Sequence, residues 1–352
     1  MSGFIGTKLT MNLGERSYDI ILKNGALENL YQFARLDRRV AVVTDAGVPA
    51  EYAQRVADQC RDAKIITVPQ GEASKSMKIL ESVLRQMLEF NMGRGDLVIA
   101  VGGGVVGDLA GFAASIYMRG IDFINCPTTT LSMIDSSIGG KTAVDLGETK
   151  NIVGSFWQPR LVIVDPSTLA TLPRRQYING LAESVKASLL ADPELFAIFE
   201  KGDIDEQIGE IIYRSLRFKK SIVEQDETEH GMRKALNFGH TIGHAFELAG
   251  HYETWTHGQG VAAGMHWVAQ LGVGLGITPP EVVEQIRSIL NKFGLPQDIP
   301  CPWETMTEAV GLDKKRTGDS ITLILLERLG QAVPRRMKKD QLLELLEPMC
   351  GR

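Results

Sequence analysis

The sequence predicts an α/β domain built on a parallel sheet, followed by a mainly α-helical domain. Three observations predict this fold class. Short apolar runs alternate with helical patterns in the first half, as in parallel sheets covered on both faces. After Pro173 long helical patterns dominate. The 352 residues, 44% of them hydrophobic, suffice for two domains with buried cores. We place the domains at residues 1–173 and 174–352.

Strands in the first domain are expected where β-branched runs end in turn residues. The expected strands are Val40–Asp45, Lys64–Pro69, Asp96–Val101, Phe123–Pro127 and Leu161–Pro166. Helical spacing lies between them, for example over Ser76–Phe90. The opening segment Lys8–Leu22 predicts a separate hairpin around Gly14 and Glu15.

Helical patterns fill most of the second domain. The expected helices are Tyr177–Leu190, Asp205–Glu227, Lys234–Ala249, Val261–Leu275, Pro280–Phe293 and Lys339–Met349. A β-pair is expected within Ser320–Met337. The uncharged segment Gly260–Ile277 contains five glycines and lacks flanking basic anchors. It therefore predicts a buried helix and no membrane span.

The overall charge and the cysteine usage indicate which classes of protein are disfavoured and in which compartment the protein is expected. A formal net charge of −5 argues against a generalised nucleic-acid binder. The four cysteines form no CxxC pair, which disfavours a disulfide framework and favours a reducing compartment. The N-terminal segment meets charged residues too early for a signal peptide. We therefore expect a cytoplasmic protein.

A glycine-rich turn follows the strand Asp96–Val101. Residues Gly102–Asp108 read GGGVVGD and lead into an apolar helical stretch. Glycines between a strand and a helix let backbone N–H groups approach a phosphate. The alternative is a tight turn that needs glycine for steric reasons alone. Asp45, which ends an earlier strand, either binds a ribose hydroxyl or is only a turn residue.

All six histidines lie between His230 and His266. His240 and His244 are four residues apart, so a helix places both on one face. Spacing alone favours this pair as metal ligands, with His257 as a third nitrogen donor. Thr241 follows His240, so the pattern is not HExxH. Each histidine could instead pack in the core or face solvent.

Glu183 is a candidate acidic metal ligand in an apolar helical stretch, LAESVKASLL. Its alternative is a salt bridge to Lys186 three residues later. Several basic residues also stand beside glycines or apolar positions, where they could converge on a phosphate and a carboxylate. Singly, each could be a surface charge. They are Arg119, Lys141, Lys150, Lys186, Lys219, Arg233, Lys314 and Lys315.

Five segments carry a resemblance to a known family over nearly the whole chain. They are VGGGVVGDLAGFAASIYMRG, PTTTLSMIDSSIGGKT, LAESVK, LNFGHTIGHAFE and HGQGVAAGM. In order and spacing the chain resembles the 3-dehydroquinate synthase family. The resemblance implies a lyase that converts 3-deoxy-D-arabino-heptulosonate 7-phosphate into 3-dehydroquinate and phosphate, using NAD and zinc or cobalt. It also implies a Rossmann-like first domain, an active site in the cleft between the domains, and a homodimer.

The resemblance also assigns residues. The implied metal ligands are Glu183, His240 and His257, which moves His244 from the metal to the substrate. The implied NAD-binding residues are Asp45, Glu72, Lys75, Gly103, Gly104, Asp108, Thr128, Thr129, Lys150 and Thr171. The implied substrate-binding residues are Arg119, Asp135, Lys141, Asn151, Lys186, Lys219, Arg233, Asn237, His244 and Lys315, the last preferred over Lys314.

One position departs from the family pattern HGEAVA, because Gln259 stands where the glutamate would be. This change could alter the surroundings of His257. Three alternatives to the implied activity stay open: another sugar phosphate cyclase, a glycerol-dehydrogenase-like oxidoreductase, and a catalytically silent metal- and nucleotide-binding protein. Arg233 and Asn237 match the pattern for a carboxylated substrate, and SIGGKT and LAESVK speak against the oxidoreductase.

Overall fold

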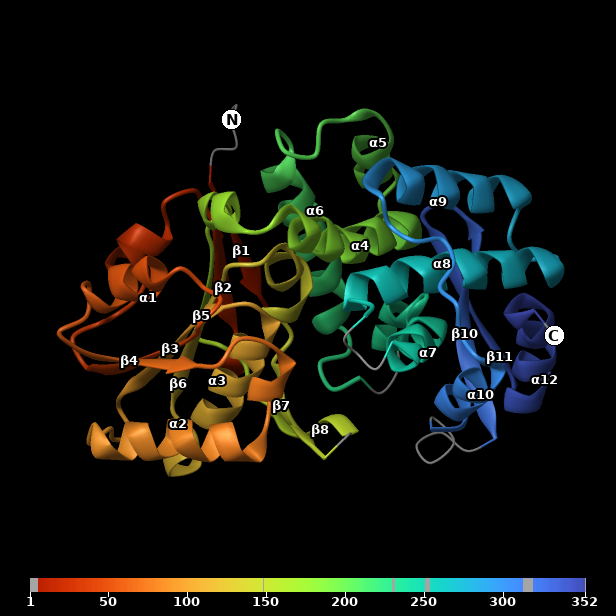
Figure 1. The fold of residues 1–352 in the computed structure, drawn as a ribbon. Helices are drawn as coiled ribbons and strands as arrows, with labels where there is room; N and C mark the ends of the chain where they lie inside the picture. The colour runs from red at the N-terminus through yellow and green to blue at the C-terminus, as the bar shows by residue number, and fades with distance from the viewer. Residues whose placement is uncertain (1–5, 148, 230–231, 251–253, 313–318, 352) are drawn as a thin grey trace. The chain divides into compact units, whose positions relative to one another are not determined.

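The computed structural model describes residues 6–147, 149–229, 232–250, 254–312 and 319–351 (Figure 1). The chain forms two compact units, and the division falls after Tyr177, inside helix α4 (Arg174–Ala191). The first unit also contains Ile208–Thr228, which holds helix α6 (Ile208–Val223). These units are defined by contacts within the chain. The division into functional domains at residues 1–173 and 174–352 stays a prediction.

The first unit is built on a seven-stranded sheet with the order β1-β2-β9-β6-β5-β3-β4. All neighbouring strands are parallel except β1 and β2, which pair antiparallel at one edge. The strands are β1 (Thr7–Met11), β2 (Tyr18–Leu22), β3 (Arg39–Asp45), β4 (Asp62–Val68), β5 (Leu97–Gly102), β6 (Asp122–Pro127) and β9 (Leu161–Val164). The predicted parallel sheet and N-terminal hairpin are confirmed.

Helices cover both faces of this sheet (Figure 1). Helices α2 (Met77–Glu89) and α3 (Gly104–Ile116) pack with one core, which includes Val43, Val98 and Phe123. Helix α1 (Ala50–Ala57) packs on the opposite face with a second core, which includes Val42 and Ile99. Alternate residues of one strand thus enter opposite cores, so β3 and β5 are apolar along nearly their whole length.

The strand order reverses at β3. From β3 the chain passes to β4 on one side, and β5 then pairs with β3 on the other side. In open parallel sheets, ligands bind outside the carboxyl ends of the strands at such a switch point. Asp45 ends β3, and Gly102 ends β5. Two of the predicted nucleotide-binding segments therefore meet at the position that the topology favours.

A second hairpin in the first unit was not predicted. Strands β7 (Lys141–Leu146) and β8 (Thr149–Phe156) pair antiparallel outside the main sheet. Lys141 begins β7, directly after Gly139 and Gly140. Both glycines have positive φ values, 94° and 70°, which side chains disfavour. Their conformation explains the glycine pair in SIGGKT.

The second unit is mainly helical, as predicted. Its helices after α4 are α5 (Pro193–Lys201), α7 (His240–Ala249), α8 (His257–Gly274), α9 (Pro280–Phe293), α10 (Trp303–Leu312) and α12 (Lys339–Leu346). Strands β10 (Ser320–Arg328) and β11 (Gln331–Lys338) form the predicted antiparallel pair. Helices α5 and α10 were not among the predicted helices.

The predicted helix Lys234–Ala249 is wrong as one continuous element. A 3-10 helix η7 (Met232–Asn237) comes first, and α7 begins at His240. Gly239 separates them with φ +78° in the left-handed region, which a helix cannot continue through. The predicted helix Val261–Leu275 in fact begins four residues earlier, at His257. Both changes place a histidine at the first position of a helix.

Glycines bring α7 and α8 unusually close together. A Cβ atom on Gly264 would lie 2.1 Å from the carbonyl oxygen of Gly239. Gly243 and Gly260 face one another in the same way, because a Cβ on either would lie within 3 Å of the other's backbone oxygen. Much of the glycine in NFGHTIGHAFE and HGQGVAAGM therefore serves helix packing.

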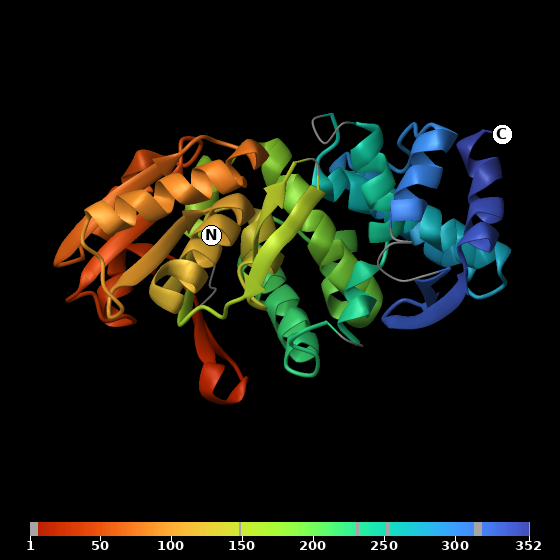
Figure 2. The ribbon, with the colours of Figure 1, turned by 90° about the horizontal axis from the view of Figure 1, so that it is seen from below.

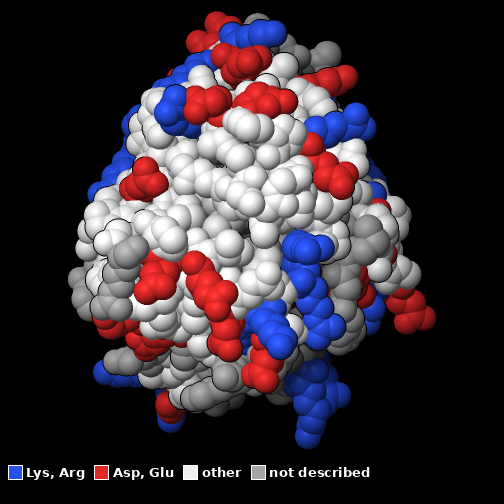
Figure 3. Space-filling view, turned by 90° about the vertical axis from the view of Figure 1, so that its right-hand side faces the viewer, with Lys and Arg blue, Asp and Glu red and all other residues white. Residues whose placement is uncertain are grey.

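Within the described part of the chain, we find no helix whose length and apolar content suit a membrane crossing. The uncharged segment predicted as a buried helix lies largely in α8, where most residues from Val261 to Gly272 are buried. Figure 3 shows the face that carries the C-terminal elements, where acidic and basic side chains surround an area of uncharged residues. Charges of both signs intermix there, in keeping with the modest net charge.

Candidate functional site: a metal-ligand cluster and a nucleotide-binding edge

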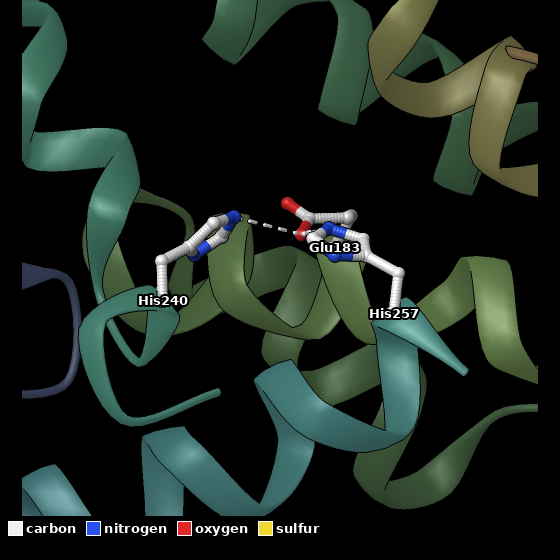
Figure 4. Close-up of side chains that lie close together, drawn as sticks. All are labelled: Glu183, His240 and His257. Carbon is white, nitrogen blue, oxygen red and sulfur yellow. Dashed lines mark ion pairs between the residues drawn. The ribbon is translucent and has the colours of Figure 1, made fainter. Parts of the chain in front are cut away.

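Glu183, His240 and His257 converge in the second unit (Figure 4). The Nε2 atom of His240 lies 3.4 Å from Oε1 of Glu183, and Nε2 of His257 lies 3.3 Å from the same oxygen. One possible ligand atom from each residue lies within 4.8 Å of the others. A carboxylate with two imidazoles is a donor set typical of catalytic zinc sites.

Each ligand candidate comes from a different helix. Glu183 lies in the middle of α4, where all residues from Leu181 to Leu190 are buried. His240 and His257 are the first residues of α7 and α8. The glycine contacts between α7 and α8 bring these two helix starts close enough for both rings to reach one carboxylate. The packing of three helices therefore builds the cluster, and no local spacing could do so.

The far side of each imidazole has a hydrogen-bond partner. Nδ1 of His240 lies 3.2 Å from the carbonyl oxygen of Phe238, and Nδ1 of His257 lies 2.9 Å from Oε1 of Glu247. With a proton on Nδ1, each Nε2 would be free to bind a metal ion beside Glu183. Such outer partners fix the tautomer and orientation of metal-binding histidines.

Charge contacts keep Glu183 ionised despite its burial. Both carboxylate oxygens are buried and accept no hydrogen bond from the described residues, while Lys186 forms an ion pair with Oε2. Burial alone would raise the pKa of Glu183, but the charges of Lys186 and His240 hold this pKa well below its ordinary value. A buried carboxylate whose polar neighbours are an ammonium group and two imidazoles is suited to a cation. The residues present therefore fit a divalent metal.

The two histidines respond differently to the same surroundings. Burial and the positive charge of Lys186 lower the pKa of His240, which favours the neutral imidazole. Burial also acts to lower the pKa of His257, but the nearby carboxylates of Glu183 and Glu247 favour its protonated form and raise this pKa to about 10.

His244 lies one turn after His240 on α7, and its side chain is exposed. Its ring centroid lies 5.7 Å from that of His240. His244 is outside the cluster around Glu183, although it can share a second group with Glu247 and His257. Spacing alone favoured His240 and His244 as a pair of metal ligands. In the structure, His257 and not His244 joins His240 beside Glu183.

Glu247 was missed by sequence reasoning. It lies at position i+7 from His240 and i+3 from His244, so all three share one helical face. This spacing could have identified Glu247 from the sequence as a neighbour of the two histidines. The expected influence of Gln259 on His257 is not visible, because Gln259 instead forms a capping box with Thr256 at the start of α8. The direct partner of His257 is Glu247.

Three other predicted substrate residues belong to the second unit. Arg233 is buried, with 2% of its surface exposed, and Asn237 in η7 is exposed. Lys186 is buried beside Glu183. Lys315, like Lys314, lies outside the described residues.

The glycine turn of the first unit begins α3 directly after β5. Gly103 is the N-cap of α3, and Gly104 is its first residue. A Cβ on Gly103 would lie 3.1 Å from Thr129, and one on Gly104 would lie 3.0 Å from Ser136. The turn therefore has a steric reason for glycine, and it also leaves a helix N-terminus open for an anion. The steric interpretation is confirmed, and the phosphate-binding interpretation stays a prediction.

Threonines and an aspartate surround this edge of the sheet. The backbone N–H of Thr128 donates to the carbonyl oxygen of Gly102 at 2.9 Å, and Thr129 follows it. Asp45 is buried and accepts the N–H of Gly47 at 2.7 Å, so it does form the turn that was its alternative role. Thr171 pairs with the hydroxyl of Tyr52 at 2.9 Å.

Lys75 is the centre of a charged cluster close to the start of α3. Its Nζ lies 2.7 Å from Oδ2 of Asp108 and also donates to Oδ1 of Asn151. Glu72 lies 3.8 Å from the Nζ atoms of both Lys75 and Lys150. The structure therefore brings together residues that the sequence assigned separately to NAD and to substrate.

Burial and charge set the protonation of this cluster. Burial lowers the pKa of Lys75, but the charges of Asp108 and Glu72 outweigh it and raise the pKa. For Asp108, burial is the largest influence, and it raises the pKa against the opposing effect of Lys75. The close contact with Lys75 and the burial of Asp108 thus act in opposite directions on the Asp108 carboxyl.

The remaining predicted substrate residues lie elsewhere in the first unit. Lys219 on α6 binds Asp135, with Nζ 2.9 Å from Oδ1 and 2.8 Å from the backbone oxygen. Asp135 belongs to a π-helical turn, η5 (Ser132–Ser136), a conformation common at functional sites. Lys141 and Arg119 have exposed side chains, and Arg119 has φ +70°.

Comparisons with known proteins identify the family of this chain. Family models described as 3-dehydroquinate synthase N-terminal and 3-dehydroquinate synthase C-terminal match residues 65–179 and 180–316. A 3-dehydroquinate synthase of Clostridium perfringens is 41% identical over 335 residues, which cover 92% of this chain and 96% of that relative.

Two solved structures resemble the whole chain. A 2-deoxy-scyllo-inosose synthase complexed with carbaglucose-6-phosphate, NAD⁺ and Co²⁺ has a TM-score of 0.87 at 27% identity, covering 97% of this chain and 100% of that one. The 2-epi-5-epi-valiolone synthase of Streptomyces hygroscopicus, with NAD⁺ and Zn²⁺ bound, has a TM-score of 0.85 at 28% identity, covering 97% and 99%. With both family models matched in sequence order, the chain belongs to the 3-dehydroquinate synthase family.

Proposed function

We propose that this chain converts 3-deoxy-D-arabino-heptulosonate 7-phosphate into 3-dehydroquinate and phosphate, with NAD and a divalent metal as cofactors. The observation that carries the proposal is the convergence of Glu183, His240 and His257 in a chain of this family. The reaction is a transient oxidation, elimination of phosphate, reduction, ring opening and intramolecular aldol closure. It needs a metal centre, a nucleotide site and groups that neutralise a doubly anionic substrate.

The metal would be held by Glu183, His240 and His257. A metal in such a site acts as a Lewis acid on substrate hydroxyl oxygens. The chain's own residues prepare the site. Lys186 balances the Glu183 charge until a cation binds, while Glu247 and the Phe238 carbonyl orient the two imidazoles. The related solved structures that hold Co²⁺ or Zn²⁺ support either ion.

NAD would bind at the switch point of the first unit. The N-terminus of α3 beside Gly103 and Gly104 offers backbone N–H groups to the pyrophosphate. Asp45 ends β3, and Asp108, the partner of Lys75, lies on α3 itself. NAD supplies a hydride acceptor that is regenerated within each turnover. Both related solved structures hold NAD⁺, which supports this assignment.

Substrate anions would be bound by basic residues that the chain already holds in defined positions. Lys219 is fixed by Asp135, and Lys141 follows the two positive-φ glycines. Arg233 and Asn237 are the predicted partners of the substrate carboxylate. Such positioned charges lower the barrier to phosphate loss because they need little reorganisation during the reaction.

Replacing Glu247 with glutamine is expected to weaken metal binding about tenfold, and replacing it with alanine about a hundredfold. Glutamine keeps an acceptor for Nδ1 of His257 but loses the charge, whereas alanine loses both. Titration with a competing chelator measures the affinity. The control is Glu281→Gln, which removes the charge of an exposed glutamate at the start of α9. Unchanged affinity in Glu247→Ala would show that this contact does not support the metal site.

Replacing His244 with alanine is expected to lower kcat by about a hundredfold or more, while metal content stays near that of the original chain. The reason is that His244 lies outside the Glu183 cluster and would act in proton transfer at the substrate. Phosphate release gives kcat, and elemental analysis gives the metal content. If both fall in parallel, His244 belongs to the metal site after all.

Substrate choice tests the proposed reaction against the other sugar phosphate cyclases. Phosphate release should be fast with the heptulosonate phosphate and slow with a heptulose 7-phosphate that lacks the carboxylate. The reverse preference would reject the proposed substrate while keeping the cyclase class. A cytoplasmic location and a homodimer are further parts of the proposal. The location rests on the cysteine usage, and the homodimer rests on the family resemblance.

A further inference from the structure

The N-terminal hairpin, β1 and β2 with the turn η1 (Gly14–Arg16) between them, has no role in the function proposed so far. It forms the antiparallel edge of the sheet, and its turn projects from the rest of the first unit (Figure 2). The N-terminal family model begins only at residue 65. The hairpin nevertheless contacts two segments that carry predicted substrate-binding lysines.

The first contact reaches the turn before Lys141. Tyr18, the first residue of β2, is 3% exposed, and its hydroxyl oxygen accepts the backbone N–H of Gly139 at 3.2 Å. Gly139 and Gly140 are both in the left-handed region, so the backbone here depends on external contacts to keep one conformation. Tyr18 therefore supports the turn that places Lys141 at the start of β7.

The second contact reaches the end of α6, which carries Lys219. Asn12 donates from its backbone N and from Nδ2 to Oε1 of Glu224, at 2.6 and 2.7 Å. Arg16 lies 2.7 Å from Oε2 of Glu227. Both glutamates follow α6 directly, about one to two turns beyond Lys219. The hairpin thus anchors the C-terminal end of the helix that holds Lys219 against Asp135.

A third contact joins the first two. Nε2 of Gln158 donates to Oε1 of Glu227 at 3.0 Å. The same side chain packs on Gly140, where a Cβ would lie 2.6 Å from Cδ of Gln158. Tyr18, the Gly139–Gly140 turn, Gln158, Glu227 and Arg16 therefore form a closed chain of contacts that begins and ends in the hairpin.

We propose that the N-terminal hairpin is a positioning element that holds the Gly139–Gly140 turn and the end of α6 so that Lys141 and Lys219 bind the substrate anions. This inference rests on the proposed function, because it takes both lysines as substrate-binding groups. The hairpin residues themselves touch no reacting atom. Their loss should therefore affect substrate binding and leave the binding of NAD and metal unchanged.

Two variants test this role in the full-length, metal-loaded enzyme. Tyr18→Phe removes only the hydroxyl that accepts the Gly139 N–H. The double variant Asn12→Ala with Arg16→Ala removes the side-chain contacts to α6. Each is expected to raise the KM for the phosphorylated substrate about three- to tenfold, the effect of losing one or two hydrogen bonds. Lys8→Ala, which breaks the exposed Lys8–Asp19 ion pair of the same hairpin, is the control and should leave KM unchanged.

The supporting result is a higher substrate KM in both test variants, with NAD affinity, metal content and melting temperature close to those of Lys8→Ala. An unchanged substrate KM in both would overturn the inference. A parallel loss of NAD affinity, metal content and stability would also overturn it, since that pattern means a general structural role. Lys141→Ala and Lys219→Ala test the underlying assignment separately, because normal substrate KM in these two variants would reject the proposed function of the lysines.

Discussion

Replacing Glu183 with glutamine is expected to lower kcat by about a thousandfold and to remove most of the bound metal. Glutamine has nearly the same shape, but it cannot supply the negative charge that faces two imidazoles and Lys186. Lewis-acid stabilisation is worth several kcal/mol in the transition state, and each 1.36 kcal/mol corresponds to a tenfold change in rate. Lys186 would add to the effect, because it would stay buried without its partner.

Metal content and phosphate release, measured on the same preparation, check this expectation. Glu308→Gln on the exposed side of α10 is the control for removing a glutamate charge from the second unit. A Glu183→Gln variant that keeps full metal content and turnover would contradict the assigned metal site. Circular dichroism on each variant distinguishes loss of the metal from loss of the fold.

Replacing Gly264 with alanine is expected to destabilise the protein by about 1–3 kcal/mol, the usual cost of overpacking a close contact. The new Cβ would lie 2.1 Å from the carbonyl oxygen of Gly239. That oxygen accepts the N–H of Gly243 in the first turn of α7. The helices must therefore separate, which also moves His240 away from His257. Metal affinity should fall although no ligand has changed.

The same helix supplies the matched control for Gly264→Ala. Gly274 ends α8, and no atom lies within 4 Å of the position that a Cβ would take there. Gly274→Ala should be neutral or stabilising by up to about 1 kcal/mol, because alanine favours helix more than glycine does. Denaturant unfolding with and without metal measures both effects. Equal stability and equal metal affinity of the two variants would show that close packing of α7 and α8 does not build the site.

The sheet was predictable because its signal is local. The strands β3, β5 and β6 have mainly apolar centres and end in turn residues, and this pattern needs no knowledge of distant contacts. The hairpin of β7 and β8 was missed because its segments are mostly half-buried or exposed, which leaves only a weak apolar pattern. The break before α7 was also missed, since a single left-handed glycine, Gly239, interrupts an otherwise helical pattern.

The site was less predictable than the fold for a related reason. His240 and His244 share a helix face, so their spacing favoured them as a ligand pair, but His257 and Glu183 come from two other helices. Only tertiary packing brings those side chains together. The family resemblance implied the cluster that the geometry then produced. Glu247 could have been found from spacing, since it shares the face of α7 with both histidines.

Phosphate release from the heptulosonate phosphate by cofactor-free protein tests whether the reaction needs both NAD and a metal bound at Glu183. The protein is first freed of metal and of bound NAD, and then assayed with neither cofactor, with each alone and with both. We expect phosphate release only when NAD is restored together with Zn²⁺ or Co²⁺, and no recovery in Glu183→Gln. Phosphate release at the full rate without either cofactor would contradict the proposed need for NAD and metal.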